Sequence, residues 1–200
     1  MKKIAPIALT IFVATYISPV LAEDNNWYVG GSYTAQKISF SPAGRDFKTL
    51  GFTAGYQYNQ YFSLETRFSK GMSGNTYDYT VVGFEDEEAG EKTDIDYQAL
   101  ILIKASYPLS EKFNVYATTG YAQTQIERKV LDPMLNSMTG VNQSTFTSTE
   151  KGLTYGLGAD YKVTNNVSLF VEYQTLPDWK PVSSVSHNWD SINLGFNYAF

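Results

Sequence analysis

The stretch SINLGFNYAF, residues 191–200, alternates polar and apolar side chains up to the last residue of the chain. Its apolar residues take every second position: Ile192, Leu194, Phe196, Tyr198 and Phe200. A period of two places all five on one face of a β-strand. Because chain ends are normally polar and frayed, a strand that ends on phenylalanine predicts a role for that last residue.

The first 22 residues have the pattern of a secretory signal peptide. Two lysines precede a mostly apolar run, which ends at the small residue Ala22 before a polar stretch. A membrane anchor is the alternative, but two prolines interrupt the run, which is also short for a bilayer span of about 20 residues. We therefore expect residues 1–22 to be a signal peptide and residues 23–200 to form one domain.

The composition favours a β protein without disulfides. The chain has no cysteine, and its 16 Tyr, 12 Phe and 3 Trp belong to the residue types enriched in strands. No stretch after the signal approaches the length of a transmembrane helix, which needs about 18 apolar residues. Loss of the two signal lysines changes the formal charge from −5 to −7, which argues against a nucleic-acid partner.

Seven further stretches alternate like the last one. They span residues 27–40, 47–58, 61–70, 94–107, 113–122, 152–162 and 167–174. Within the fourth of them, Ile95 falls in the apolar row, while Leu100 and Leu102 interrupt the polar row. Three connections are tight turns, around residues 59–60, 109–112 and 164–166, and four are longer, over residues 39–46, 70–93, 127–149 and 176–187. An even number of strands with short turns at one rim and long loops at the other is typical of outer-membrane barrels.

The two faces of the strands decide between a soluble and a membrane barrel. In a soluble barrel the apolar row would line the cavity. Here the opposite row carries small and polar residues, which suit a narrow polar lumen, and the bulky row suits a lipid-facing belt. Aromatic residues gather near the tight turns, like the girdle of a membrane barrel: Trp27, Tyr56, Tyr58, Phe62, Tyr107, Phe113, Tyr161, Tyr198 and Phe200. The prediction is an all-β, eight-stranded antiparallel up-and-down transmembrane β-barrel with short periplasmic turns and long extracellular loops. A soluble β-sandwich is the alternative.

One hairpin resembles a known family. The stretch YGLGADYKVTNNVSLFVEYQ, residues 155–174, is similar to the penultimate hairpin of the small eight-stranded outer-membrane barrels that include the OmpA transmembrane domain and OmpX. Two glycines precede an aromatic residue, a short turn with asparagines and an acidic-tyrosine pair, and the resemblance covers nearly all of residues 27–200. It implies a monomer in the outer membrane of a Gram-negative bacterium, in contact with lipid and lipopolysaccharide.

The same resemblance gives the C-terminal strand a role. In such proteins a terminal aromatic residue with alternating apolar residues before it is read by the barrel assembly machinery. Phe196, Tyr198 and Phe200 would form that assembly signal here. The peptidoglycan-binding domain that follows the barrel in OmpA is not expected, since the chain ends at the eighth strand.

Four charged residues of the polar row are counted at a similar depth from the turns: Glu65, Arg67, Lys104 and Glu172. A strand rises about 3.3 Å per residue, so these side chains should meet inside the barrel. Buried charges must pair or lose their charge. We therefore predict an interior ion network that plugs the barrel. A similar cluster in OmpA-like barrels is discussed as a gate, which is the alternative.

The sequence gives little support for an enzyme. The only histidine, His187, lies near Asp190 and Ser191 in a polar segment. Residues three and four apart in a strand do not converge as they would on a helix. We therefore predict that the chain is not an enzyme and uses no cofactor.

An acidic segment in the second long connection raises the question of metal binding. Its members are Glu85, Asp86, Glu87, Glu88, Glu91, Asp94 and Asp96. Oxygen ligands suit Ca²⁺ or Mg²⁺, but the spacing of an EF-hand is absent. A solvated acidic loop without a metal is predicted instead.

Strand-forming residues continue beyond the predicted belt, in NTYDYTVVGF and STFTSTEKG. We predict that the central strands extend as a sheet above the outer surface, similar to that described for OmpX, with edges open to strand addition. The candidates for contacts are Tyr77, Tyr79, Val81 and Phe84, with residues 85–88 as charged guards against self-association. The alternative is that these side chains pack against the neighbouring loop.

The sequence thus predicts a porin-like outer-membrane barrel with a structural or surface role and without a large open pore. One alternative is a surface-interaction protein, an adhesin or host-factor binder that acts through its long loops. The other is a pore for small solutes.

Overall fold

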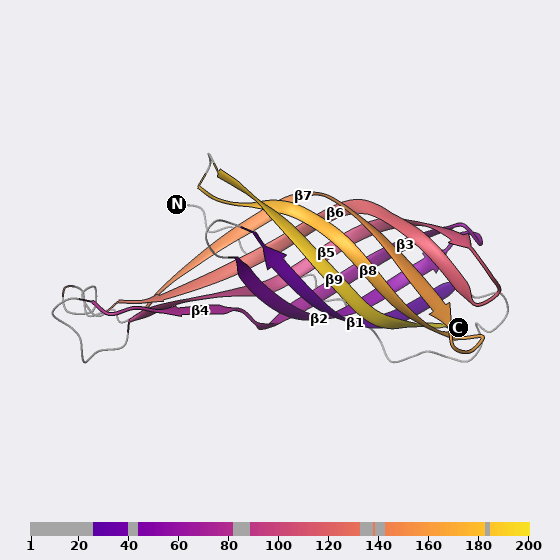
Figure 1. Cartoon of the computed structure of the whole chain (residues 1–200), viewed down its shortest axis with the longest axis horizontal. Coiled ribbons are helices and arrows are strands. Elements are labelled where there is room, and N and C mark those ends of the chain that lie inside the picture. Colours follow the sequence, from indigo (N-terminus) through magenta and orange to yellow (C-terminus); the bar gives the residue numbers. More distant parts are fainter. Residues whose placement is uncertain (1–25, 40–43, 82–88, 133–137, 139–142, 183–184) are drawn as a thin grey trace, which may run out of the picture.

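The computed structural model describes residues 26–39, 44–81, 89–132, 138, 143–182 and 185–200. Its strands are β1 (Trp27–Ile38), β2 (Arg45–Gln57), β3 (Phe62–Ser73), β4 (Asn75–Asp78), β5 (Gly90–Pro108), β6 (Phe113–Leu131), β7 (Gln143–Lys162), β8 (Val167–Val182) and β9 (Val185–Ala199). β4 continues β3 beyond Gly74, because both pair with β5. Every ladder is antiparallel, and the β1–β9 and β3–β5 ladders close the sheet (Figure 1). The predicted eight-stranded barrel is confirmed.

No helix in the described part of the chain is long and apolar enough to cross a bilayer. The predicted signal peptide, residues 1–22, lies outside the described residues.

The three tight turns share one hydrogen-bond design. In the first, Asn59 Oδ1 accepts hydrogen bonds from the backbone amides of Tyr61 and Phe62, both at 2.8 Å. Ser110 and Thr164 hold the other two turns in the same way. Such side chains stand in for a backbone partner and favour a turn. All three turns border one cavity of about 340 Å³, so they lie at the same end of the barrel.

The outer surface of the barrel is apolar. The five apolar residues of the C-terminal strand are each 39–52% exposed. Between them, Ser191, Asn193 and Asn197 point inward and are buried. All nine predicted girdle aromatics are exposed. The alternation therefore places apolar side chains outside, as lipid contact requires.

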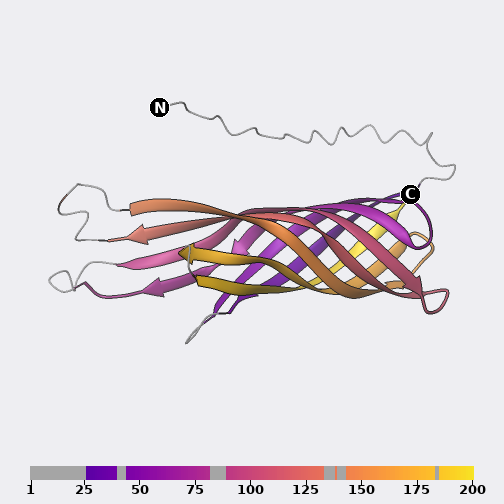
Figure 2. The ribbon, with the colours of Figure 1, turned by 90° about the horizontal axis from the view of Figure 1, so that it is seen from above.

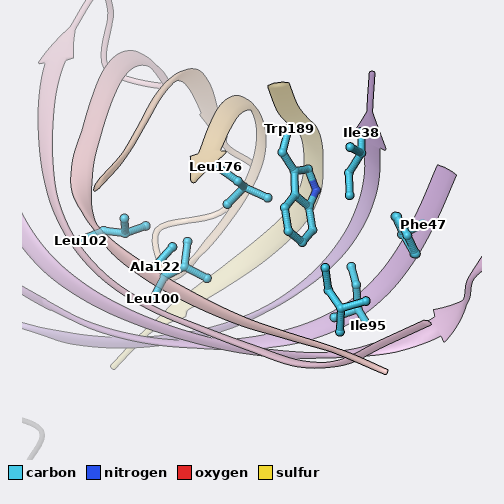
Figure 3. Packing of buried hydrophobic residues seen from close by; sticks show 9 residues of the cluster. Ile38, Phe47, Ile95, Leu100, Leu102, Ala122, Leu176 and Trp189 are labelled. Atoms are coloured by element: carbon cyan, nitrogen blue, oxygen red, sulfur yellow. The ribbon is translucent and has the colours of Figure 1, made fainter. Parts of the chain in front are cut away.

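The interior is not polar along its whole length. Nine buried residues form a cluster that we call the apolar layer: Ile38, Phe47, Ile95, Leu100, Leu102, Ala122, Ile126, Leu176 and Trp189. Figure 3 shows these side chains inside the curved sheet, with Trp189 between Leu176 and Ile38. The predicted polar lumen is thus wrong for this level of the barrel. Leu100 and Leu102 mark the reason, since they follow the inward row and make it apolar there.

The predicted outward position of Ile95 is also wrong. The β5–β6 register passes from Ile95↔Ile126 directly to Tyr97↔Gln125, so Asp96 is an extra residue in a β-bulge. A bulge shifts the alternation by one position. Ile95 therefore points inward and is 3% exposed.

The central strands extend well beyond the others, as predicted. The β5–β6 ladder reaches Gly90↔Leu131, and the β6–β7 ladder reaches Leu131↔Gln143. Figures 1 and 2 show β4 to β7 projecting past the ends of β1 and β2. The predicted long connection over residues 176–187 is wrong, because β8 runs to Val182 and β9 begins at Val185.

Candidate functional site

The barrel interior holds a network of charged side chains near the turn end. Arg67 lies between two carboxylates, with Nη2 2.6 Å from Glu65 Oε2 and Nη1 2.5 Å from Glu172 Oε1. Its Nε also donates to Glu65 at 2.9 Å, and Nη2 donates to Glu172 Oε2 at 3.0 Å. Arg67 thus contacts both oxygens of Glu172, the paired geometry that a guanidinium suits best, while its Nε and Nη2 both donate to Glu65 Oε2.

Lys104 joins this network from β5. Its Nζ lies 3.9 Å from Glu65 Oε1 and 3.3 Å from Asp160 Oδ2. Asp160 also accepts a hydrogen bond from Asn114 Nδ2 at 2.7 Å. The structure therefore brings all four predicted charges together and adds Asp160. We call these five residues the charged layer.

Neutral side chains complete the hydrogen bonds of the carboxylates. Tyr28 donates its hydroxyl to Glu65 Oε1 at 2.7 Å. Asn193 Nδ2 donates to Glu172 Oε1 at 3.4 Å. Glu65 is 1% exposed and Glu172 is fully buried. Carboxylates this deep need such partners, because an isolated buried charge is very costly.

Aromatic rings border the charges, and glycines make room for them. Tyr28 lies opposite Gly55 in the β1–β2 register, and Tyr116 opposite Gly158 in the β6–β7 register. A Cβ on either glycine would collide with the facing tyrosine ring. Lys104 Nζ lies 3.9 Å from the centre of the Tyr116 ring, a cation–π contact. The narrow lumen can hold both charges and rings because the neighbouring inward positions carry no side chain.

Sequence reasoning missed Asp160 and the inward aromatic residues. Asp160 lies only two residues from the end of β7, whereas Lys104 lies four residues from the end of β5. The tilt and stagger of the strands bring such positions to one level. The inward rings of Tyr28 and Tyr116 could have been found from the sequence, because each is an aromatic residue in the polar row with a glycine at the facing position of the next strand.

A second ionic contact lies at the other end of the apolar layer. Arg45 Nη1 donates to Thr93 Oγ1 at 2.6 Å, and Arg45 Nη2 lies 2.7 Å from Glu91 Oε1. The Arg45 guanidinium also lies 5.2 Å from the Trp179 ring centre. This contact joins β2, β5 and β8 above the buried leucines and Trp189. Neither the motifs nor the spacing had singled out Arg45.

The three residues considered above for catalysis, His187, Asp190 and Ser191, each have another contact. Ser191 is buried and donates to the backbone oxygen of Gln174, while Asp190 Oδ1 accepts from Thr175. The His187 ring lies 6.1 Å from the ring of Trp179. Successive residues of a strand point to opposite faces, so Asp190 and Ser191 do not face one site.

The acidic segment is only partly described, because residues 85–88 lie outside the described residues. Of the remainder, Glu91 pairs with Arg45, Asp94 pairs with Lys92 at 3.1 Å, and Asp96 accepts from Gln125. Within the described residues, no group of three or more side chains could hold a metal ion.

The predicted contact residues differ in exposure. Tyr77 is 68% exposed, and its ring lies 6.3 Å from that of Tyr79. Tyr79 and Val81 are half-buried, and the Tyr79 hydroxyl donates to the backbone oxygen of Leu131 at 3.5 Å. Phe84 lies outside the described residues. Of the described candidates, only Tyr77 offers an exposed ring.

The C-terminal aromatic row lies on the outer face. Phe196, Tyr198 and Phe200 are all exposed, and the Tyr198 and Phe200 rings meet edge to face at 5.4 Å. The Phe200 amide donates to the backbone oxygen of Trp27 at 3.2 Å. The last residue therefore contacts the first strand where the barrel closes.

Comparison with known proteins agrees with this architecture. The profile of the outer membrane protein beta-barrel domain family matches residues 7–200. No curated protein sequence matches the chain. The fold is similar to that of Ail, the attachment invasion locus protein of Yersinia pestis, solved in complex with the heparin analogue sucrose octasulfate: TM-score 0.58, 11% identity, 89% of this chain and 100% of that one.

Two other solved barrels are comparable. Neisserial surface protein A aligns with TM-score 0.58 and 17% identity over 88% of this chain and 98% of its own. OprG from Pseudomonas aeruginosa aligns with TM-score 0.50 and 15% identity over 88% of this chain and 96% of its own. At these identities the likeness shows the fold alone.

Proposed function

Because the chain belongs to the outer membrane protein beta-barrel domain family, we propose that it is a closed barrel that presents its extended strands at the cell surface without conducting solutes. Its place is the outer membrane of a Gram-negative bacterium. The short turns then face the periplasm, and the extended strands β4 to β7 face outward.

The observation that carries this proposal is the double closure of the lumen. Eight strands leave an interior just wide enough for side chains to fill. Here the charged layer lies toward the tight turns, and the apolar layer begins beside it, where Leu102 and Leu100 lie opposite Glu65 and Arg67, and continues away from the turns to Trp189. Together the two layers oppose the passage of ions and water, since the first holds its charges in pairs and the second fills the lumen with apolar side chains.

Single-channel recording in planar bilayers tests this closure. We expect no stepwise conductance from the purified protein. The variant Arg67→Ser/Lys104→Ser should stay closed, because the apolar layer remains. A gate formed by the charges alone would open in that variant. Stepwise conductance of the unmodified protein would contradict the proposal and favour the small-solute pore.

A positive control is needed for this recording. The combined variant Arg67→Ser/Lys104→Ser/Leu102→Ala/Trp189→Ala thins both layers and should conduct if the preparation can report an open lumen. Its folding is checked by a heat-dependent shift on gels. The proposal then depends on the contrast between the double and the quadruple variant.

A surface-interaction role is the second candidate, and the free edge of β7 favours it. The β7–β8 ladder ends at Tyr155↔Thr175, so residues 143–154 of β7 have ladder partners on β6 alone. β8 still contacts this edge at Gly152 and Glu150, which leaves residues 143–149 as its open part. Open strand edges can recruit an extended segment of another chain. Tyr77 on β4 and Phe146 on β7 are exposed rings of the same extended sheet. Deletion of residues 76–90 should leave the barrel folded and abolish any adhesion of expressing cells that uses Tyr77, and adhesion that survives would exclude Tyr77 and assign the contact to the β7 edge.

We also propose that Phe196, Tyr198 and Phe200 act as the insertion signal read by the assembly machinery. Their exposure on the terminal strand supports this role. The matched pair Phe200→Ser and Phe113→Ser removes one girdle ring in each case. If Phe200 belongs to the assembly signal, only Phe200→Ser should slow insertion into the membrane of cells. Both variants should refold equally well into synthetic vesicles, where the assembly machinery is absent.

A further inference from the structure

We propose that the outer faces of β2 and β3 bind the phosphate of an anionic lipid headgroup in the outer leaflet, through Lys48 and Lys70. The inference uses the location in the outer membrane and does not depend on whether the lumen is closed.

The sheet register brings the two lysines together. Lys70 lies opposite Leu50 of β2, and Lys48 lies two residues from Leu50 on the same strand. All three side chains are exposed on the outer face. The β2–β3 register shifts between Lys48, which pairs with Ser73, and Thr49, which pairs with Gly71. Diagonal neighbours lie about 7–8 Å apart in a regular ladder, and two flexible amines can reach one phosphate across such a separation.

The pair lies at the edge of the lipid-facing belt, on the side away from the tight turns. Leu50 is 57% exposed and lies two residues closer to the turns than Lys48, and Phe68 is 53% exposed and lies two residues closer to the turns than Lys70. On the other side of Lys70, Tyr97 stacks on Phe68 with a ring separation of 6.1 Å. The amines therefore stand where hydrocarbon gives way to headgroups, above an apolar and aromatic surface that suits acyl chains.

No acidic side chain in the described part of the chain neutralises the two lysines. Neither Lys48 nor Lys70 forms an ion pair there. The acids beyond them have their own neighbours: Asp46 lies opposite Lys37 in the β1–β2 register, and Asp96 accepts a hydrogen bond from Gln125. Two unpaired amines side by side attract an anion more strongly than one.

The rim formed by β8 and β9 lacks this feature. On β8 and β9 the belt ends at Tyr173 and Ile192, and the next outward positions are Thr175 and Asp190. Thr175 donates to Asp190 at 3.1 Å, so this rim presents a carboxylate. The basic pair thus defines one sector of the rim rather than a ring.

The chemistry of the pair favours a phosphate monoester on a lipid, as in the glucosamine headgroup of lipopolysaccharide. Such a phosphate carries up to two negative charges and no ammonium of its own. A zwitterionic phospholipid already pairs its phosphate internally and gains less from two lysines. The belt beneath the lysines adds acyl contacts that a free phosphate cannot make.

Lipid retention in the folded protein tests the site. The variant Lys48→Gln/Lys70→Gln is compared with Lys112→Gln/Lys162→Gln, which removes two lysines at the turn end. Each protein is refolded in detergent, checked by its heat-dependent gel shift and titrated with lipid A, with phosphatidylethanolamine and with inorganic phosphate, and the bound species are counted by native mass spectrometry.

We expect the first variant to bind lipid A about thirtyfold more weakly, since each lysine near an anionic surface contributes about a factor of five. The control variant should bind like the unmodified protein. Equal binding of lipid A by the first variant would overturn the site, and so would a similar loss in both variants. Inorganic phosphate or phosphatidylethanolamine bound as tightly as lipid A would overturn the ligand class. Because the conductance of the barrel is measured separately, failure here leaves its closure untouched.

Discussion

The charged layer and the apolar layer close the same lumen by opposite means. In the charged layer, Arg67 holds two buried carboxylates, and each member depends on its neighbours for its charge to be tolerated. In the apolar layer, Leu102, Trp189 and their neighbours gain free energy from exclusion of water and need only a matching shape. The two layers should therefore respond differently to mutation. Removal of any one charged side chain should destabilise the barrel strongly, whereas the apolar layer should tolerate substitutions that keep its shape.

The largest effect is expected from removal of the central cation. Arg67→Leu leaves Glu65 and Glu172 buried without their main partner, at a cost of about 3–5 kcal/mol of unfolding free energy. Urea titration of the protein in lipid vesicles measures it. Arg128→Leu is the control, because Arg128 is a half-exposed partner of Glu91 at 3.7 Å and should cost less than about 1 kcal/mol. Similar losses in both variants would contradict the distinction between the layers.

Removal of one apolar side chain should cost less. Leu102 is fully buried, so Leu102→Ala deletes packing and leaves a cavity, with an expected loss of about 2–4 kcal/mol in the same titration. Ile103→Ala is the matched control on the next residue, which is 55% exposed on the outer face. If the outer variant lost more than the inner one, the apolar layer would not be a packed core.

The space around the charged layer can be tested from its glycines. In Gly158→Ala the added Cβ would lie 2.6 Å from the Tyr116 hydroxyl oxygen and from the Val171 backbone oxygen, and the expected cost is about 1–3 kcal/mol. Gly152→Ala is milder, because its closest new contact is Pro177 at 3.2 Å. The double variant Gly158→Ala/Tyr116→Ala removes the ring but keeps the contact with the Val171 backbone oxygen, so the penalty for the alanine should fall in that background without vanishing. An undiminished penalty would show that the ring contributes nothing to it.

The sequence predicted the barrel because period-two alternation directly records which face of a strand meets lipid. It predicted the positions of Glu65 and Glu172 because both lie on the inward row. It failed at Ile95, where the bulge at Asp96 shifts the alternation without a mark in the local pattern. It also failed to predict Asp160, because depth counted along one strand ignores the stagger between strands.

The interior chemistry itself was harder to predict than the topology. Leu100 and Leu102 stood out as exceptions to a polar row, but two exceptions do not reveal a nine-residue layer built from six strands. Contributions such as Phe47 and Trp189 come from the far ends of β2 and β9, and only the closed register brings their rings to 6.4 Å. A pattern along one strand cannot show which inward side chains share a level.

The smallest net effect is expected when the charged layer is converted into an apolar one. Glu65→Leu/Arg67→Met/Glu172→Leu removes all three central charges together, so no charge of that group is left without a partner. Replacement of a complete buried ion group by apolar residues of similar size is often neutral or stabilising, and we expect a change within about 2 kcal/mol in urea titration. The Tyr28 hydroxyl loses its acceptor and Lys104 keeps only Asp160, which argues for the unfavourable side of that range. A loss as large as that of Arg67→Leu alone would show that the charges stabilise the barrel as a group, and the difference between the two layers would then lie in strength rather than in kind.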